Sequence, residues 1–78
     1  MEKVLYVVDG WDGDTEYFHN EKNAKKEFNT RLEEVDDCIF LYDELDENDN
    51  DVYIEYKYHD EELNADYFLT FQRVEFSD

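Results

Sequence analysis

Residues 20–35 read NEKNAKKEFNTRLEEV, and no other segment of the chain has helical periodicity. Apolar side chains recur in this segment three or four residues apart, at Ala24, Phe28, Leu32 and Val35. The spacing predicts one amphipathic helix from about Glu21 to Glu34, with Asn20 as its N-cap. Because the apolar stripe is narrow, we expect the helix to lie against a sheet.

The segments on either side of this helix have the composition of strands. Lys3–Val8 is short and β-branched, and after a turn over residues 10–14 the chain returns as a second strand at Thr15–Phe18. Three further strands are predicted after the helix, at Cys38–Tyr42, Val52–Tyr58 and Tyr67–Phe76. The apolar residues of the last strand change face near Thr70–Arg73, where we expect a β-bulge.

The order β-β-α-β-β-β predicts an α+β fold. We expect an antiparallel sheet of about five strands with one amphipathic helix packed on one face. The chain contains no internal repeat and no linker, so residues 1–78 are expected to form a single domain.

The charge of the chain is extreme and unevenly distributed. There are 24 Asp and Glu residues against 7 Lys and Arg, a net charge of −17 on 78 residues, whereas a small domain ordinarily carries a charge of about 2 to 8 in magnitude. Residues 20–35 hold four acids and four bases, while residues 43–66 hold eleven acids and only Lys57. The sequence therefore predicts an acidic face rather than a uniformly acidic surface.

This charge narrows the classes of partner. Phosphate backbones and anionic membranes would be repelled, so neither direct nucleic-acid binding nor membrane binding is expected. Runs of charge usually form solvated surfaces, but repulsion at this density weakens a fold, which favours a role in binding a basic protein, one that itself binds nucleic acid. The chain has no long apolar run and no leader segment, and we expect it to be cytoplasmic.

We predict three groups of partner-binding residues. The main row consists of Asp43, Glu44, Asp46, Glu47, Asp49, Asp51 and Glu55. The second group consists of Asp60, Glu61, Glu62 and Asp66, and the third of Asp9, Asp12 and Asp14. Trp11 adjoins the third group on a turn, where it either packs back onto the sheet or anchors a partner.

Nothing in the chain forms a recognisable catalytic arrangement, so we expect no enzyme activity, no cofactor and no metal site. His19 and His59 have no Cys or His at metal-ligand spacing. The segment from Asp46 to Asn50 begins like a calcium-binding loop, but Asp51 replaces the required glycine, and a calcium-binding module stays open only as an alternative. Cys38, the single cysteine, forms no internal disulfide and is expected to be buried.

In size, charge, absence of an internal disulfide and density of carboxylates over Asp43–Asp66, the chain resembles the small acidic DNA-mimic inhibitors of bacteriophages and mobile elements. These include anti-restriction, anti-CRISPR and uracil-DNA glycosylase inhibitors, which share no common fold, so no residue role is transferred. The resemblance implies that a carboxylate surface occupies the basic channel of a nucleic-acid-processing enzyme, in the cytoplasm of the host cell. An acidic chaperone-like protein that shields a basic partner is the alternative, and an exposed edge strand leaves a homodimer open.

Overall fold

The computed structural model describes residues 2–11 and 14–77. Along the chain it contains β1 (Glu2–Gly10), β2 (Asp14–Phe18), α1 (Glu21–Glu33), β3 (Ile39–Leu45), β4 (Asp51–Asp60) and β5 (Ala65–Ser77). The α+β class and the β-β-α-β-β-β order predicted from the sequence are confirmed. The strands extend beyond the predicted apolar segments because the backbone ladders continue into polar residues, as in the pairing of Asp60 with Ala65.

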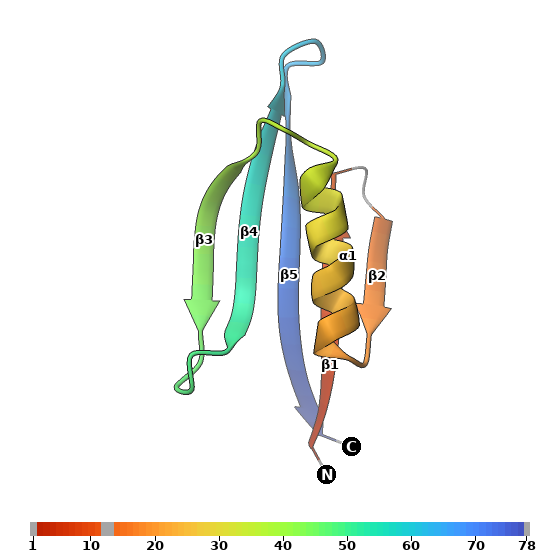
Figure 1. The fold of residues 1–78 in the computed structure, drawn as a ribbon, viewed down its shortest axis with the longest axis vertical. Coiled ribbons are helices and arrows are strands. Elements are labelled where there is room, and N and C mark those ends of the chain that lie inside the picture. Colours follow the sequence, from red (N-terminus) through yellow and green to blue (C-terminus); the bar gives the residue numbers. More distant parts are fainter. Residues whose placement is uncertain (1, 12–13, 78) are drawn as a thin grey trace.

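All five strands form one antiparallel sheet, in the order β2-β1-β5-β4-β3. The last strand of the chain, β5, therefore lies at the centre, and β2 and β3 form the two edges (Figure 1). The molecule measures 47 × 24 × 18 Å, and its long axis follows the strands. At one end the turn between β4 and β5 projects beyond the rest of the molecule (Figure 1).

The β-bulge predicted at Thr70–Arg73 is wrong. The register of β5 runs without interruption against β1 and β4, and the irregularities lie instead between β3 and β4, at Phe40/Tyr42 and at Glu44/Leu45. The apolar residues of β5 do change face, because buried Leu69 and Phe71 face α1, whereas Val74 lies on the opposite side of the pleat. β5 continues past the N-terminal end of α1 (Figure 1). Its last residues therefore lie beyond the helix, which accounts for the change of face without a bulge.

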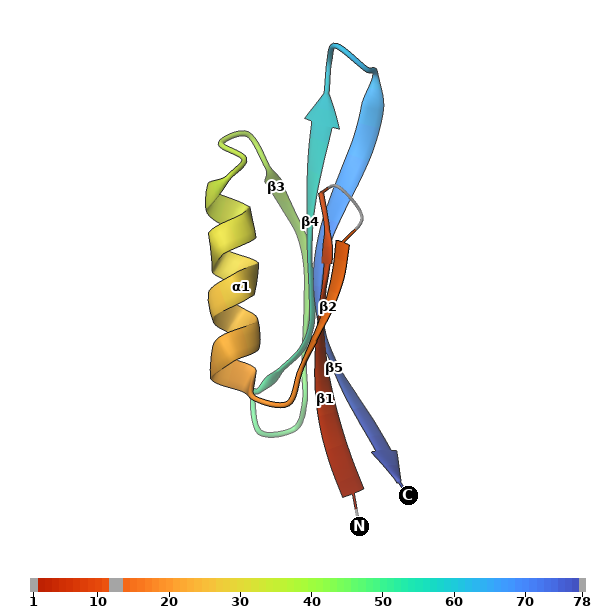
Figure 2. The same cartoon turned by 90° about the vertical axis from the view of Figure 1, so that its right-hand side faces the viewer.

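The helix begins as predicted and covers only part of the sheet. The Asn20 side chain accepts a hydrogen bond from the backbone N–H of Asn23 at 3.2 Å, which confirms the N-cap. α1 packs on β1, β2 and β5, and the buried core between the two layers consists of Val8, Ala24, Phe28, Leu69 and Phe71. Figure 2 shows the helix on a single face, so no helix or strand of the described residues covers the opposite face of the sheet.

The edge strand β3 lies beyond the reach of the helix. All seven of its residues are exposed, including the large apolar side chains of Ile39, Phe40, Leu41, Tyr42 and Leu45. The prediction that Cys38 is buried is wrong: it is half-buried and precedes β3. An apolar run predicts a strand, but its burial depends on where the helix packs, and α1 packs on the other half of the sheet.

Candidate protein-binding surface

The turn between β3 and β4 is held by Asp46. Its Oδ1 accepts hydrogen bonds from the backbone N–H groups of Asn48 at 2.8 Å and Asn50 at 3.0 Å. These two hydrogen bonds lower the pKa of the Asp46 carboxyl below its ordinary value, and the bond from Asn50 has the larger effect. Asp46 was predicted to bind a partner, but its carboxylate is engaged in forming the turn, as aspartates in this position commonly are.

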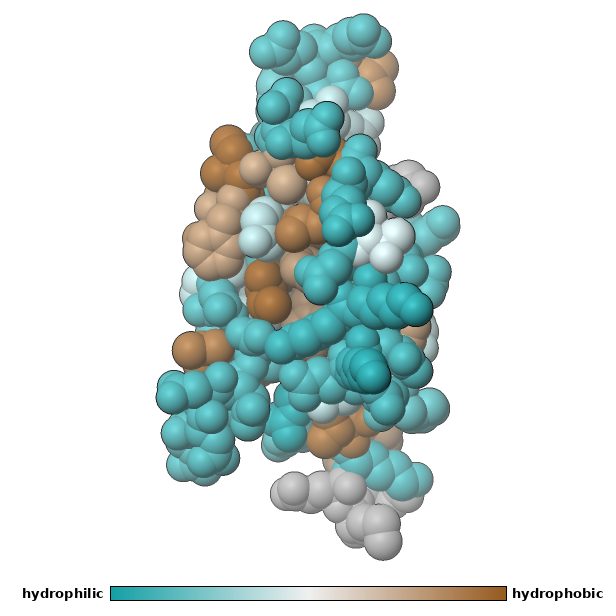
Figure 3. Space-filling model, viewed as in Figure 1, coloured by the Kyte–Doolittle hydropathy of each residue, from teal (hydrophilic) through white to brown (hydrophobic). Residues whose placement is uncertain are grey.

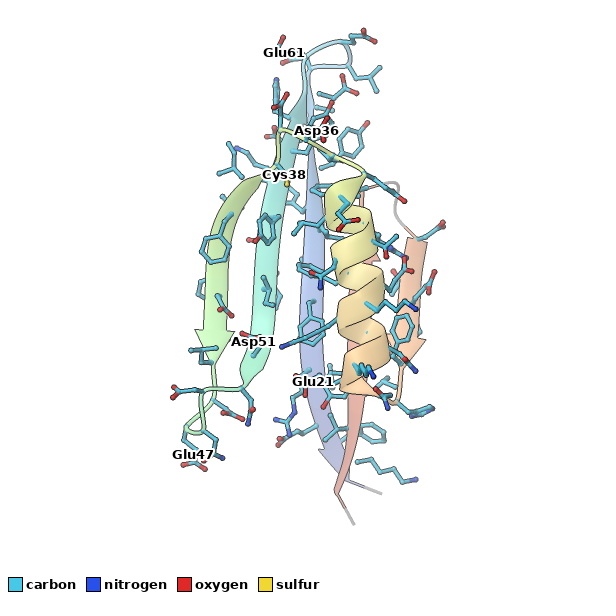
Figure 4. The ribbon with its side chains drawn as sticks, viewed as in Figure 1. Glu21, Asp36, Cys38, Glu47, Asp51 and Glu61 are labelled. Carbon is cyan, nitrogen blue, oxygen red and sulfur yellow. The ribbon has the colours of Figure 1, made fainter. Side chains whose placement is uncertain are left out.

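Two other carboxylates of this turn are free to face a partner. Glu47 and Asp49 are exposed, and neither forms a hydrogen bond or ion pair between its side chain and another described residue. Asp49 has a φ of 62°, a left-handed conformation that aspartate tolerates better than most residues. Figure 4 shows Glu47 at the tip of the turn.

The turn between β4 and β5 repeats this arrangement. Asp60 Oδ1 accepts hydrogen bonds from the backbone N–H groups of Glu62 at 2.9 Å and Leu63 at 3.2 Å. The side chains of Glu61 and Glu62 are exposed and form no polar contact within the described part of the chain. In each turn one aspartate shapes the backbone, and two neighbouring acids are presented to solvent.

The two turns lie at opposite ends of β4 (Figure 4). β4 has ten residues, and at about 3.3 Å per residue it separates the turns by about 30 Å. The first two predicted groups therefore form two separate acidic clusters. We call Glu47 and Asp49 the β3–β4 cluster, and Glu61 and Glu62 the β4–β5 cluster.

The predicted main row does not lie on one face of the sheet. Asp43 pairs with Ile54 on the side that faces α1, whereas Glu44 and Glu55 lie on the opposite side of the pleat. Glu55 Oε2 accepts a hydrogen bond from the Tyr53 hydroxyl at 3.0 Å. Alternation along a strand separates neighbouring residues, so the row is divided between the two faces.

Asp51 pairs with a lysine on α1, and Asp43 lies beside this pair. Lys25 Nζ lies 2.7 Å from Asp51 Oδ2 and 3.3 Å from Glu21 Oε1, and the bond to Asp51 is the main reason that the pKa of Lys25 is raised. The pKa of Asp43 is raised. The largest cause is partial desolvation of its carboxyl group, and the second is the neighbouring Asp51 carboxylate. Three carboxylates around one ammonium group leave this site with an excess of negative charge.

The raised pKa of Asp43 predicts a pH-dependent effect of neutralising it. The folded state holds the Asp43 proton more tightly than the unfolded state, so the stability from this group is present at low pH and is lost as the pH rises through the raised pKa. We expect Asp43→Asn to melt at a higher temperature than the native protein at pH 7, and the difference to disappear below the ordinary aspartate pKa of 3.8. Thermal melts followed by circular dichroism from pH 3 to 8 measure this.

The matched control for Asp43→Asn is Glu47→Gln, which also removes one negative charge but at an exposed turn. Its stabilising effect should be smaller than that of Asp43→Asn at pH 7. Equal gains from the two variants would mean that only net charge matters, and would contradict a specific repulsion between Asp43 and Asp51.

One described member of the third predicted group, Asp14, contacts a buried arginine through its backbone. Arg31 is 6% exposed, and its guanidinium lies 2.7 Å from Glu27 Oε2 and 3.3 Å from Glu16 Oε1 and donates to the carbonyl oxygen of Asp14 at 2.7 Å. Asp9 Oδ1 accepts a hydrogen bond from the Thr15 hydroxyl at 3.0 Å. Asp12 lies outside the described residues, and the carboxylate of Asp14 is exposed.

Trp11 packs back onto the domain, one of its two predicted roles. Its indole N–H donates to the backbone carbonyl of Arg31 at 2.7 Å, and its ring meets Tyr58 edge to face at a centroid distance of 6.2 Å. A tryptophan whose polar atom is satisfied inside the fold contributes first to stability.

Asp37 belongs to the candidate surface and was not predicted. It lines an open hollow of about 640 Å³ with Ile39, Tyr58, His59, Asp60, Glu61 and Glu62. Beside this hollow, His59 Nδ1 lies 2.7 Å from Asp66 Oδ1, and this bond is the main reason that the pKa of Asp66 is lowered. In the sequence, the pair Asp36-Asp37 only separates the helix from a strand, and the fold alone brings Asp37 beside the β4–β5 cluster.

No described lysine or arginine pairs with a side chain of either cluster. Two cations do reach the β3–β4 turn and the start of β4, but each is already paired: Arg73 Nη1 lies 3.9 Å from Asp46 Oδ2 and 2.6 Å from Glu75 Oε1, and Lys25 pairs with Asp51. No lysine or arginine occurs in the sequence between Arg31 and Lys57, which covers the whole of β3 and the first half of β4. Lys22 and Lys26 are exposed on α1. A cationic partner would therefore meet the least opposition along the β3 and β4 side of the molecule.

The described residues give no support to a metal site, since no three side chains of His, Cys, Asp or Glu among them converge in a geometry that could hold a metal ion. Within the same part of the chain, α1 is neither long enough nor apolar enough to cross a membrane.

Comparison with known proteins gives no assignment, since the chain matches no protein family model, no curated protein and no solved structure. A function must therefore be argued from the surface itself.

Proposed function

We propose that this protein is an acidic inhibitor that binds the basic channel of a nucleic-acid-processing or defence enzyme in place of nucleic acid. The observation that carries the proposal is the pair of clusters at the two ends of β4, Glu47 with Asp49 and Glu61 with Glu62, whose exposed side chains pair with no described lysine or arginine. Their separation of about 30 Å along β4 is close to one turn of B-DNA, about 34 Å. An enzyme whose phosphate-binding sites lie one turn of DNA apart would therefore bind both clusters at the same time.

The energetic cost of this surface supports a binding role. Unpaired carboxylates repel each other and contribute nothing to the core, so a surface of this kind weakens the isolated protein. A channel lined with lysine and arginine relieves that repulsion and steers the two proteins together. Direct binding of nucleic acid is disfavoured by the same charge, and an action in the cytoplasm, where such enzymes work, is part of the proposal.

Charge reversal in each cluster tests the proposal. We expect Glu47→Lys with Asp49→Lys, and separately Glu61→Lys with Glu62→Lys, to weaken partner binding at least tenfold each, since each replaces attraction by repulsion. The turns should stay folded because Asp46 and Asp60, which hold them, are unchanged. Lysine at position 49, where φ is 62°, adds a local cost of about 1 kcal/mol. Binding is measured by capture of nucleic-acid-binding proteins from a host lysate on the immobilised protein, with release by a short DNA duplex.

The matched control is Glu34→Lys with Asn23→Lys and Thr30→Lys, which makes the same change in net charge at exposed positions of α1 and its C-cap, away from both clusters. It should retain at least half of the native capture. Equal losses in all three variants would assign the binding to net charge and contradict a defined surface. Capture that a DNA duplex does not release would instead favour the shielding of a basic partner outside its nucleic-acid site.

A further inference from the structure

The helix leaves room for a second helix on the same face of the sheet. A helix is about 10 to 12 Å wide and strands lie about 4.8 Å apart, so one helix covers about two strands. α1 lies over β1 and β5 and reaches β2 (Figure 1). It meets β4 along one side only, where Phe28 lies 6.0 Å from Tyr56 and Lys25 pairs with Asp51, and β3 lies beyond it. The strip formed by β3 and the rest of β4 is nearly two strands wide, close to the width of one helix.

This strip is an apolar groove. Its floor is formed by Phe40, which is 54% exposed, together with half-buried Ile54 and Tyr56. Its wall on the α1 side includes Leu32 and Asn29, which line two adjoining hollows of about 260 and 510 Å³. In Figure 3 hydrophobic residues gather beside the helix on this face, among hydrophilic surroundings.

Acidic groups lie at both ends of the groove. Asp43 and Asp51 border the hollow nearer the start of α1, where Asp51 pairs with Lys25. Glu33 and Asp36 border the hollow nearer its end, and both are exposed. A complementary ligand would be apolar along its middle and positively charged at its flanks.

We propose that this groove binds an amphipathic helix of the basic partner protein, with its apolar side on Phe40, Ile54 and Tyr56 and its basic residues against the acids at the two ends. The inference rests on the proposed function, because the same partner would supply the basic helix. It adds a docking site made of apolar contacts to a surface otherwise defined by charge.

Other occupants fit this surface less well. A second copy of the chain carries the same charge of −17, and the apolar side of its own helix, including Ala24 and Phe28, is already buried in its core. An added strand would have to pair with β3, whose register is broken at Phe40/Tyr42 and again at Glu44/Leu45, and such irregularities discourage edge pairing.

The test uses a synthetic peptide of about 15 residues, with leucines along one helical face and lysines beside them, and a scrambled peptide of identical composition. Each is titrated into the isotope-labelled protein at about 0.15 M salt, which screens loose ionic attraction. We expect saturable changes in the NMR signals of Leu32, Phe40, Ile54 and Tyr56 with the amphipathic peptide alone. Changes confined to the acidic turns, or identical with both peptides, would overturn the inference.

A pair of variants makes the test specific to the groove. Phe40→Glu should weaken the binding of the amphipathic peptide at least tenfold, as expected for the loss of a central apolar contact. Phe68→Glu places the same change at a residue that is 46% exposed on the opposite face, and binding should stay within about twofold of native. Equal losses would contradict the site, and self-association abolished by Phe40→Glu would assign the groove to a second copy and overturn the inference.

Failure of this inference can be told apart from failure of the proposed function. If Phe40→Glu leaves capture of the cellular partner intact while reversal of Glu47 and Asp49 abolishes it, the groove inference fails and the proposed function stands. If reversal of either cluster changes nothing while the peptide still binds the groove, the proposed function fails and, with it, the identification of the ligand as part of a nucleic-acid-binding enzyme.

Discussion

Gly10→Ala is expected to lower the free energy of unfolding by about 3 kcal/mol or more, which could exhaust the stability of a domain of this size, roughly 4 to 12 kcal/mol. Gly10 is buried, pairs with Leu69 on β5 and has a φ of +153°, which L-residues rarely adopt. A Cβ atom there would meet the carbonyl oxygen of Phe68 and lie 2.5 Å from the Cα of Leu69. Both obstacles are backbone atoms of the central strand, so no side-chain movement relieves the clash.

Urea unfolding followed by circular dichroism measures this loss. Tyr17→Ala is the control, since Tyr17 lies on the neighbouring strand β2 and is 65% exposed; it should cost less than about 1 kcal/mol. A Gly10→Ala variant as stable as the Tyr17 control would show that β1 and β5 are not as close as described.

Phe71→Ala is expected to cost about 3 to 5 kcal/mol, the usual range for removing a fully buried phenylalanine. Phe71 is 0% exposed, and its ring lies 5.9 Å from Tyr6 and 6.0 Å from Phe28, between the sheet and α1. Few other large side chains of the described core are fully buried, so neighbouring residues can only partly fill the space.

The control for Phe71 lies on the same strand. Phe76 is 41% exposed near the end of β5, and Phe76→Ala should cost less than half as much, since less apolar surface is lost from the interior. Urea unfolding of both variants gives the comparison. Similar losses would mean that the face of β5 opposite α1 is covered in solution, which would contradict a sheet that is open on that side.

The sequence was sufficient to predict the elements that depend on neighbouring residues. Asn20 could be identified as an N-cap because capping involves the next three residues, and the spacing of Ala24 and Phe28 defines one side of a helix. The class and element order followed from such local signals. The bulge was misplaced because it depends on how β3 pairs with β4, and no local signal in residues 38–45 indicates that pairing.

The candidate surface could be predicted in composition and not in shape. The density of acids over residues 43–66 was evident, but the roles of individual carboxylates depend on backbone geometry. Asp46 and Asp60 bind backbone N–H groups within their own turns, whereas Glu47 and Glu61, one residue later in each turn, face solvent. Two further features depend on the packing of α1 on the other half of the sheet. They are the position of Asp37 in the surface and the groove beside Phe40.

The central position of β5 also determines when this protein can fold during its synthesis. The β1–β2–α1 unit and the β3–β4 hairpin are each made before β5, yet within the sheet they are joined only by β5, and Leu69 and Phe71 of the core belong to that strand. Folding must therefore wait until nearly the whole chain has left the ribosome. During that interval the many carboxylates of the nascent chain repel one another, which keeps exposed apolar segments such as residues 38–42 from aggregating.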